Sequence, residues 1–290
     1  GLSFLVRVRG RSVCGWGATV PLRCFVAAGA GLAAALLTRR RLGLTAAGRH
    51  YAVIGLTTVA GQLIGFTCAT PRIGTAMAAV FAAVIPLATI IVGCLWKLET
   101  ITPKKLAGLL MGLAGIVLLV GFPPVEGTGT FVIGCLYGML GALSSAIGGN
   151  YTSVHLRGEG RLEITIASFV IGGVVTLPLL YFFPVPMAPS VGDYGNLLLL
   201  GTVMSGVAYL LFFRLVGSIG ATRTNTVEFL VTVIAVFVGT CLLGESLTTA
   251  QMAGGLVLVV VCALVLDIPS LLSGRLLGRG RRRIFAFAPQ

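Results

Sequence analysis

Long apolar runs separated by short charged stretches form the main pattern along this chain. A helix needs about twenty apolar residues to cross the hydrocarbon core of a bilayer. The runs near that length occupy 21–38, 51–70, 73–96, 106–122, 131–154, 164–183, 195–213, 224–243 and 250–268. They are continuously apolar, without the alternation of barrel strands, so they predict about nine membrane-spanning helices. Arg23 lies near the start of the first run, where its long side chain could reach the membrane interface.

The composition places most of the surface in lipid. Of the 290 residues, 57% are apolar and only 10% are charged, and the mean hydropathy is +1.03. Too few charges are available to cover a water-soluble domain of this size. The seven cysteines are scattered singly through apolar stretches, which favours small buried side chains over a metal site. We therefore expect an all-α integral membrane protein without a cofactor or bound metal.

The basic residues predict how the chain is oriented. When the loops are assigned alternately to the two sides, Arg72 stands alone on one side. The other side receives Arg39, Arg40, Arg41, Arg49, Lys97, Lys104, Lys105, Arg157, Arg161, Arg214, Arg223, Arg275, Arg279, Arg281, Arg282 and Arg283. Since basic loops stay in the cytoplasm, we expect a multi-pass plasma (inner) membrane protein with a cytoplasmic C-terminus. The basic tail at 269–290 is then interpreted as a topological anchor, and the net charge of +13 does not require a nucleic-acid partner.

The first twenty residues do not fit the pattern of spans. Arg7, Arg9 and Arg11 interrupt the apolar stretch, and no uninterrupted apolar core of a signal peptide is present. We interpret 1–20 as a degenerate or truncated first helix, and the initial glycine favours an incomplete or mis-started sequence.

An internal repeat relates two distant segments at a constant offset. Ile73-Gly74 falls on Ile219-Gly220, and Glu99 falls on Glu245. Each copy has a helix, a short charged turn and a second helix. The loop assignment places Glu99 and Glu245 on opposite sides of the membrane, so the repeat is inverted. Such a repeat permits two states of similar energy, each open to one side of the membrane.

These segments resemble the drug/metabolite transporter superfamily, in its EamA-type ten-helix branch. The similarity is carried by L-W-K-L-E-T-I-T-P-K-K-L-A-G (95–108) and by F-F-R-L-V-G-S-I-G-A-T-R-T-N-T (212–226) with L-L-G-E-S-L-T-T-A-Q-M-A-G (242–254). The resemblance implies two inverted five-helix repeats, at 21–122 (helices 2–5) and 131–268 (helices 6–10), with the first helix truncated or missing. It also implies transport of amino acids, metabolites or toxic compounds. Thr232 departs from the proline that the family commonly has, whereas the first copy retains Pro86.

Glu228 is the sharpest candidate for the transport pathway. Thr224, Asn225 and Thr232 lie three or four residues from it, so the four side chains share one helix face. A buried carboxylate there could exchange protons during transport or hold a cationic group. The alternative is a structural glutamate tied to the cytoplasmic edge by water or by Arg223 or Arg214.

Further polar residues inside the spans are weaker candidates for the same pathway. These are Gln62, Ser144, Ser145 and Tyr209, and for each the alternative is an interhelical hydrogen bond. Pro86 predicts a kink that either exposes carbonyls to the pathway or is purely structural. Glu99 and Glu245 end helices, so we assign them to helix-terminus or gate architecture rather than substrate contact.

The function that these patterns favour is secondary active transport of a small molecule by alternating access, with export as the expected direction and proton coupling as one mechanism. A non-transporting membrane subunit, or an inactive truncated product, is the alternative. No metalloprotease, phosphate-loop or nucleophile-elbow motif is present, which argues against an enzyme. Gly108, Gly112 and Gly115 predict close helix packing, either within one bundle or at a homodimer face.

Overall fold

The chain is mainly helical in the part that the computed structural model describes, namely residues 2–39, 43, 48–100, 102–120, 129–156, 159–182, 191–227, 229, 253–258 and 260–261. The helices, including two π-helical segments labelled η, are α1 (Leu2–Leu37), α2 (Gly48–Ile54), η1 (Gly55–Gly61), α3 (Gln62–Leu95), α4 (Pro103–Val120), α5 (Gly129–His155), α6 (Arg161–Thr176), α7 (Pro178–Phe182), α8 (Val191–Gly201), η2 (Thr202–Val207) and α9 (Ala208–Ile219).

Six helical stretches within the described ranges are long and apolar enough to cross a membrane. They are Thr19–Leu37, Gly48–Gly74, Met77–Leu95, Gly129–His155, Arg161–Tyr181 and Leu197–Ile219, and Leu106–Leu118 is a shorter apolar helix. Each corresponds to one of the runs expected from the sequence. The all-α membrane-spanning class is therefore confirmed. Most of the expected spans 224–243 and 250–268 lie outside the described residues.

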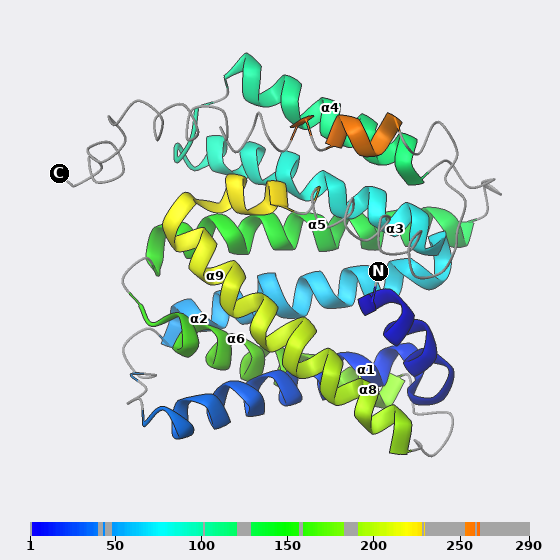
Figure 1. Ribbon diagram of the computed structural model, residues 1–290, viewed down its shortest axis with the longest axis vertical. Coiled ribbons are helices and arrows are strands. Elements are labelled where there is room, and N and C mark those ends of the chain that lie inside the picture. Colours follow the sequence, from blue (N-terminus) through cyan, green and yellow to red (C-terminus); the bar gives the residue numbers. More distant parts are fainter. Residues whose placement is uncertain are drawn as a thin grey trace.

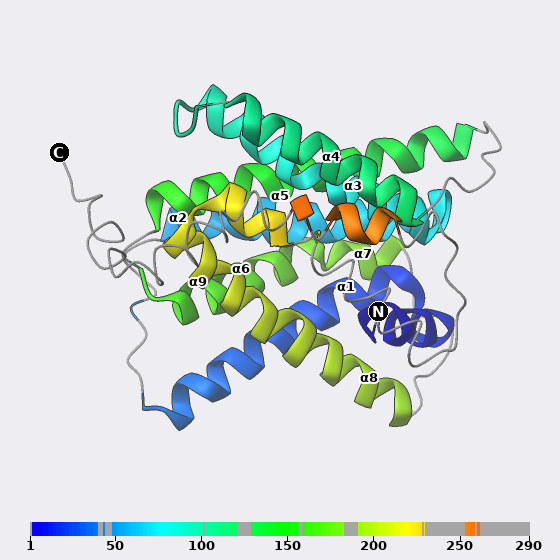
Figure 2. The same cartoon turned by 45° about the horizontal axis from the view of Figure 1, so that its top comes forward.

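The described helices form two packed groups. Figures 1 and 2 show α3, α4 and α5 together on one side of the molecule, with α1, α6 and α8 on the other and α9 crossing the second group. The pairs α3–α5, α1–α6 and α1–α8 make extensive contacts. Charged and polar side chains are costly in lipid-facing positions. We therefore expect the apolar faces of these helices to contact lipid and their polar residues to face the interior of the bundle.

α3 and α5 approach each other closely at Gly65 and Gly141. A β-carbon added to Gly65 would lie 2.5 Å from the Gly141 Cα and 2.8 Å from the Tyr137 carbonyl oxygen. Small residues allow this backbone contact, as is common where membrane helices pack. The α3–α5 interface thus depends on the absence of a side chain at Gly65.

The first span agrees with the expected 21–38, since the apolar stretch runs over Thr19–Leu37. The helix that contains it begins earlier, because α1 is helical from Leu2 and has Pro21 in its interior. Pro21 removes one backbone donor without ending the helix, so residues 2–20 and the first span are continuous in secondary structure.

Two backbone features recur 146 positions apart, which is the offset of the sequence repeat. Gly74 interrupts α3 with φ 75° and ψ 168°, and Gly220 ends α9 with φ 86° and ψ 165°. The π-helical segment η1 begins at Gly55, and η2 begins at Thr202, so the two segments also overlap at this offset. The repeated sequence therefore coincides with repeated local conformation.

Glu99 lies in the turn between the end of α3 and the start of α4. Lys97 has a positive φ of 57°, and the backbone N–H groups of Lys97 and Leu98 donate to the carbonyls of Cys94 and Gly93 at 3.0 and 2.8 Å. This is the hydrogen-bond pattern of a Schellman helix end. The next helix then begins at Pro103, where a missing N–H costs nothing.

Candidate functional site

A buried polar cluster joins α3, α5 and the helical turn 221–227, and we call Thr89, Asn150 and Asn225 the α3 polar cluster. The Asn225 amide donates to the Thr89 hydroxyl oxygen at 2.7 Å. The Asn150 amide donates to the carbonyls of Thr89 and Ala146 at 2.9 and 3.1 Å. All three residues are almost fully buried, so Thr89 connects two elements that are distant in the sequence.

Two of the expected pathway residues meet in a second group. The Tyr209 hydroxyl lies within hydrogen-bond distance of the Gln62 side-chain oxygen at 3.2 Å and of the Thr58 carbonyl at 3.3 Å. The Tyr209 ring packs edge-on against Phe169, with 4.9 Å between ring centroids. The contact joins α9 to the helix that contains η1. Gln62 and Tyr209 thus form the kind of interhelical hydrogen bond weighed as the alternative to a pathway role.

Arg23 lies elsewhere than the sequence predicted. Its side chain is only 8% exposed, and its Nε donates to the Ser205 hydroxyl in η2 at 2.6 Å. The Ser205 hydroxyl in turn donates to the Leu200 carbonyl five residues earlier, at 3.0 Å. Instead of extending to the interface, the guanidinium is packed against a π-helical turn, a feature often found at functional sites. Ser205 was not identified from the sequence, because a lone serine in an apolar run carries no distinguishing signal.

Some expected site residues occupy separate positions. Ser145 is buried, and Ser144 lies beside Gly61, where an added β-carbon would be 2.7 Å from its hydroxyl. Thr224 is buried and donates to the Gly220 carbonyl at 2.7 Å. Pro86 is buried within α3, and the helix leaves helical dihedral angles at Gly74 rather than at Pro86.

Three further candidates fall outside the described residues. They are Glu228, Thr232 and Glu245. The neighbouring Phe229 is described, and it is fully buried in an apolar cluster with Leu109 and Ile116.

Replacing Thr89 by valine is expected to lower the free energy of unfolding by about 0.5–2 kcal/mol, the range for interhelical hydrogen bonds in membrane proteins. Valine keeps the shape of threonine but removes the acceptor for the Asn225 amide. Thr89→Ser retains the hydroxyl and should lose less. Unfolding of the purified protein in mixed micelles gives both values, and equal losses for valine and serine would contradict the role of the hydroxyl.

The two histidines of the chain meet at one end of the bundle, although they are distant in the sequence. The His50 Nδ1 lies 2.8 Å from the Tyr151 hydroxyl. The rings of Tyr151 and His155 stack with centroids 4.2 Å apart, and those of His50 and His155 with centroids 5.1 Å apart. The nearby Ser153 hydroxyl donates to the Asn150 carbonyl at 2.7 Å. These contacts hold α2 against α5. The sequence did not predict them.

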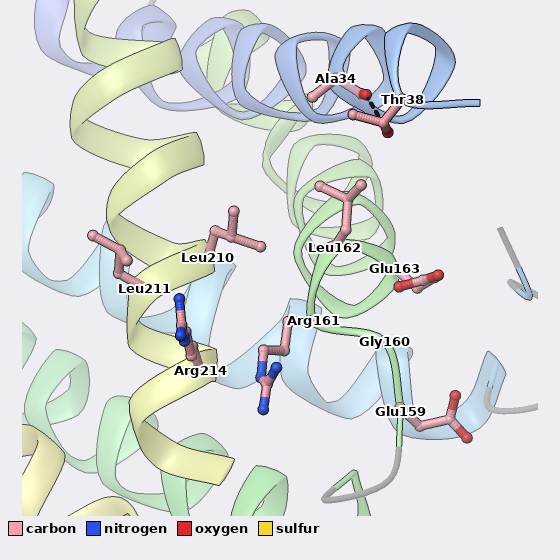
Figure 3. Close-up of a pocket in the computed structure, with 10 residues that line it drawn as sticks. All are labelled: Ala34, Thr38, Glu159, Gly160, Arg161, Leu162, Glu163, Leu210, Leu211 and Arg214. Carbon is pink, nitrogen blue, oxygen red and sulfur yellow. Dashed lines mark hydrogen bonds between the residues drawn. The ribbon is translucent and has the colours of Figure 1, made fainter. Parts of the chain in front are cut away.

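A cavity of about 840 Å³ opens between α1, the start of α6 and α9, and Figure 3 shows its lining. We call it the α1–α6–α9 cavity. It is lined by Ala34, Thr38, Glu159, Gly160, Arg161, Leu162, Glu163, Leu210, Leu211 and Arg214. From the sequence, Arg161 and Arg214 were assigned only to basic loops, and Glu159 and Glu163 were not selected.

Membrane-spanning helices whose polar residues face one another define a multi-pass α-helical membrane protein. The sequence pattern of the EamA-like transporter family matches this chain at residues 11–121 and 132–267. These two segments make up most of the chain, which therefore belongs to the EamA-like transporter family.

Two relatives are similar over part of the chain. The uncharacterized transporter YvbV of Bacillus subtilis is 28% identical over 205 residues, covering 65% of this chain and 63% of the relative. An uncharacterized transporter of Archaeoglobus fulgidus is 25% identical over 190 residues, covering 64% of this chain and 66% of the relative. The matched region thus spans just under two thirds of each relative.

The fold also resembles a solved structure. A chain titled "Crystal structure of protein" superposes with a TM-score of 0.77 at 18% identity, covering 91% of this chain and 92% of that chain. At this identity the similarity concerns the fold alone.

Proposed function

We propose that this protein is a secondary active transporter of small metabolites, amino acids or drugs that works as an exporter by alternating access. The observation that carries the proposal is the recurrence of a glycine break and a π-helical segment at the repeat offset. Two halves that have these same backbone features and opposite orientations can adopt two related arrangements of similar energy. The membership in the EamA-like family supports the same function.

The repeats proposed are 21–122 and 131–268, with 1–20 before them and the basic tail 269–290 after them. They correspond closely to the two segments that match the family, 11–121 and 132–267. The basic loops support insertion in the plasma membrane with the C-terminus in the cytoplasm.

The pathway proposed runs past the Tyr209–Gln62 contact and the α3 polar cluster toward Glu228. Asn225 is buried and precedes Glu228 by three residues, so a continuing helix would place the carboxylate near the same face. A carboxylate desolvated in that position would bind a proton more readily than one in water. Proton exchange at Glu228 would then couple substrate movement to the proton gradient.

A proteoliposome assay tests this coupling. Wild-type protein is reconstituted with a trapped pH-sensitive dye, and a mixture of amino acids is added on one side at imposed pH differences. We expect substrate-dependent proton movement in the wild type and its loss in Glu228→Gln. The control Asp193→Asn removes a carboxylate at the start of α8 instead and should keep the signal. If Glu228→Gln preserves both the flux and its pH dependence, proton coupling at this residue is wrong.

The second candidate, a non-transporting membrane subunit, makes a different prediction. It would bind a ligand without carrying it across the bilayer, so the wild type would show ligand binding but no flux in the same vesicles.

A homodimer stays a prediction as well. Gly112 and Gly115 pack against Phe229 and Leu258 of the same chain, so this face of α4 already serves packing within one bundle.

A further inference from the structure

The α1–α6–α9 cavity carries charges of both signs at its rim. Arg161 opens α6 and Arg214 lies in α9, and both side chains are exposed. Figure 3 shows Arg161 between α6 and α9 and Arg214 against α9, while Glu159 and Glu163 lie on the other side of the first turn of α6. Among the described residues, neither arginine makes an ion pair or a side-chain hydrogen bond. The rim therefore offers two cationic groups to a ligand.

The two carboxylates are held in place by their surroundings. Glu159 accepts a hydrogen bond from the Tyr51 hydroxyl at 3.3 Å. Glu163 is only 6% exposed, and its carboxylate occupies the space that a side chain at Gly160 would fill. Among the described residues that line the cavity, two arginines are balanced by two glutamates, so this part of the rim does not favour a purely anionic ligand as a basic patch would.

The remaining wall is apolar and continues onto the lipid-facing surface. Leu210, Leu211 and Leu162 line the cavity. Leu211 is 51% exposed, and Val207 and Val203, each one turn further along the same face, are 50% and 49% exposed. This stripe leads away from Arg214 along α9 and η2 toward the middle of the span 197–219. An acyl chain could follow it from the cavity into the bilayer.

We infer that the α1–α6–α9 cavity binds the headgroup of a phospholipid that carries a primary amine, phosphatidylethanolamine, with its phosphate against Arg161 and Arg214 and its ammonium beside Glu159, the more exposed of the two carboxylates. A guanidinium pairs well with a phosphate through charge-assisted hydrogen bonds. A primary ammonium donates hydrogen bonds to carboxylates, which the trimethylammonium of phosphatidylcholine cannot do. An anionic lipid such as phosphatidylglycerol would place no cation beside Glu159. The inference depends on membrane embedding and is independent of transport.

Native mass spectrometry of the full-length protein in detergent tests the inference. The protein is mixed with equal amounts of phosphatidylethanolamine, phosphatidylglycerol and phosphatidylcholine of matched acyl chains. We expect one phosphatidylethanolamine to be retained over the other two, and the double variant Arg161→Gln/Arg214→Gln to weaken its binding about tenfold. The double variant Arg49→Gln/Lys97→Gln removes two positive charges at the same end but outside the cavity, and it should bind as the wild type does.

A second variant tests the carboxylate side. Glu159→Gln keeps an oxygen for the Tyr51 hydroxyl but removes the negative charge, so it should weaken phosphatidylethanolamine binding and strengthen phosphatidylglycerol binding. Equal retention of the two lipids by the wild type, or unchanged binding after both arginines are replaced, would overturn the inference. Competition by soluble glycerophosphoethanolamine as effective as that of the lipid would also overturn it, because the ligand would then be a water-soluble molecule.

Discussion

Replacing Gly65 by valine is expected to cause one of the largest losses of stability available in this protein, about 3 kcal/mol in the free energy of unfolding, at the upper end of the usual range for overpacking. An added β-carbon would lie 2.5 and 2.6 Å from backbone atoms of Gly141. A flexible side chain could move aside, but a helix backbone can only be pushed away as a unit. The α3–α5 interface would have to separate along its length.

The measurement is the unfolding transition of the purified protein in mixed micelles, followed by circular dichroism. Gly29→Val is the matched control, because Gly29 lies in a membrane-spanning helix and has no atom within 4 Å of an added β-carbon. We expect a small change there. A loss of the same size in both variants would mean that valine is poorly tolerated in these helices generally, and the close approach would not be the cause.

Replacing Gly74 and Gly220 by alanine is expected to destabilise the protein through backbone strain alone, by about 1–3 kcal/mol at each site. Both residues have positive φ with extended ψ, a region that side chains exclude. Neither position has an atom within 4 Å of an added β-carbon, so steric contact with neighbours does not contribute. The sites lie far apart in the sequence, and the double variant should lose approximately the sum of the two values.

Gly217→Ala provides the control for this pair. Gly217 lies in α9 near Gly220 and also has open space around an added β-carbon, but its backbone is helical. Alanine is preferred over glycine in a helix by roughly 0.5–1 kcal/mol, so this change should stabilise slightly. A similar effect at Gly74 and Gly217 would show that the positive φ at Gly74 is not required by the fold.

The sequence predicted the features that depend on local pattern. Continuous apolar runs predicted the six long spans, since the bilayer requires a certain length of apolar helix. The offset that aligned Ile73-Gly74 with Ile219-Gly220 also aligned two unusual backbone conformations. Pro103 is the first residue of α4, a position where the missing N–H of proline is tolerated.

The sequence could not predict which polar residues meet, because partners come from different helices. Gln62 and Tyr209 were both selected as pathway candidates, and their contact follows only from packing. Thr89, Asn150, Ser205 and Glu163 were not selected. Arg23 was expected at the interface from its place near the start of a run, but in the folded bundle η2 supplies a hydrogen-bond partner for it.

By itself, the sequence determined that the protein is built of membrane-spanning helices, approximately where the spans of the described part lie, and which segments are similar to each other. These properties follow from hydrophobicity, capping and φ preferences, which act over a few neighbouring residues. Only the tertiary structure decided how α1, α6 and α9 enclose a cavity with two arginines and two glutamates at its rim. That arrangement depends on the rotation and approach of whole helices, and small residues such as Gly65 and Gly141 set how closely those helices can pack.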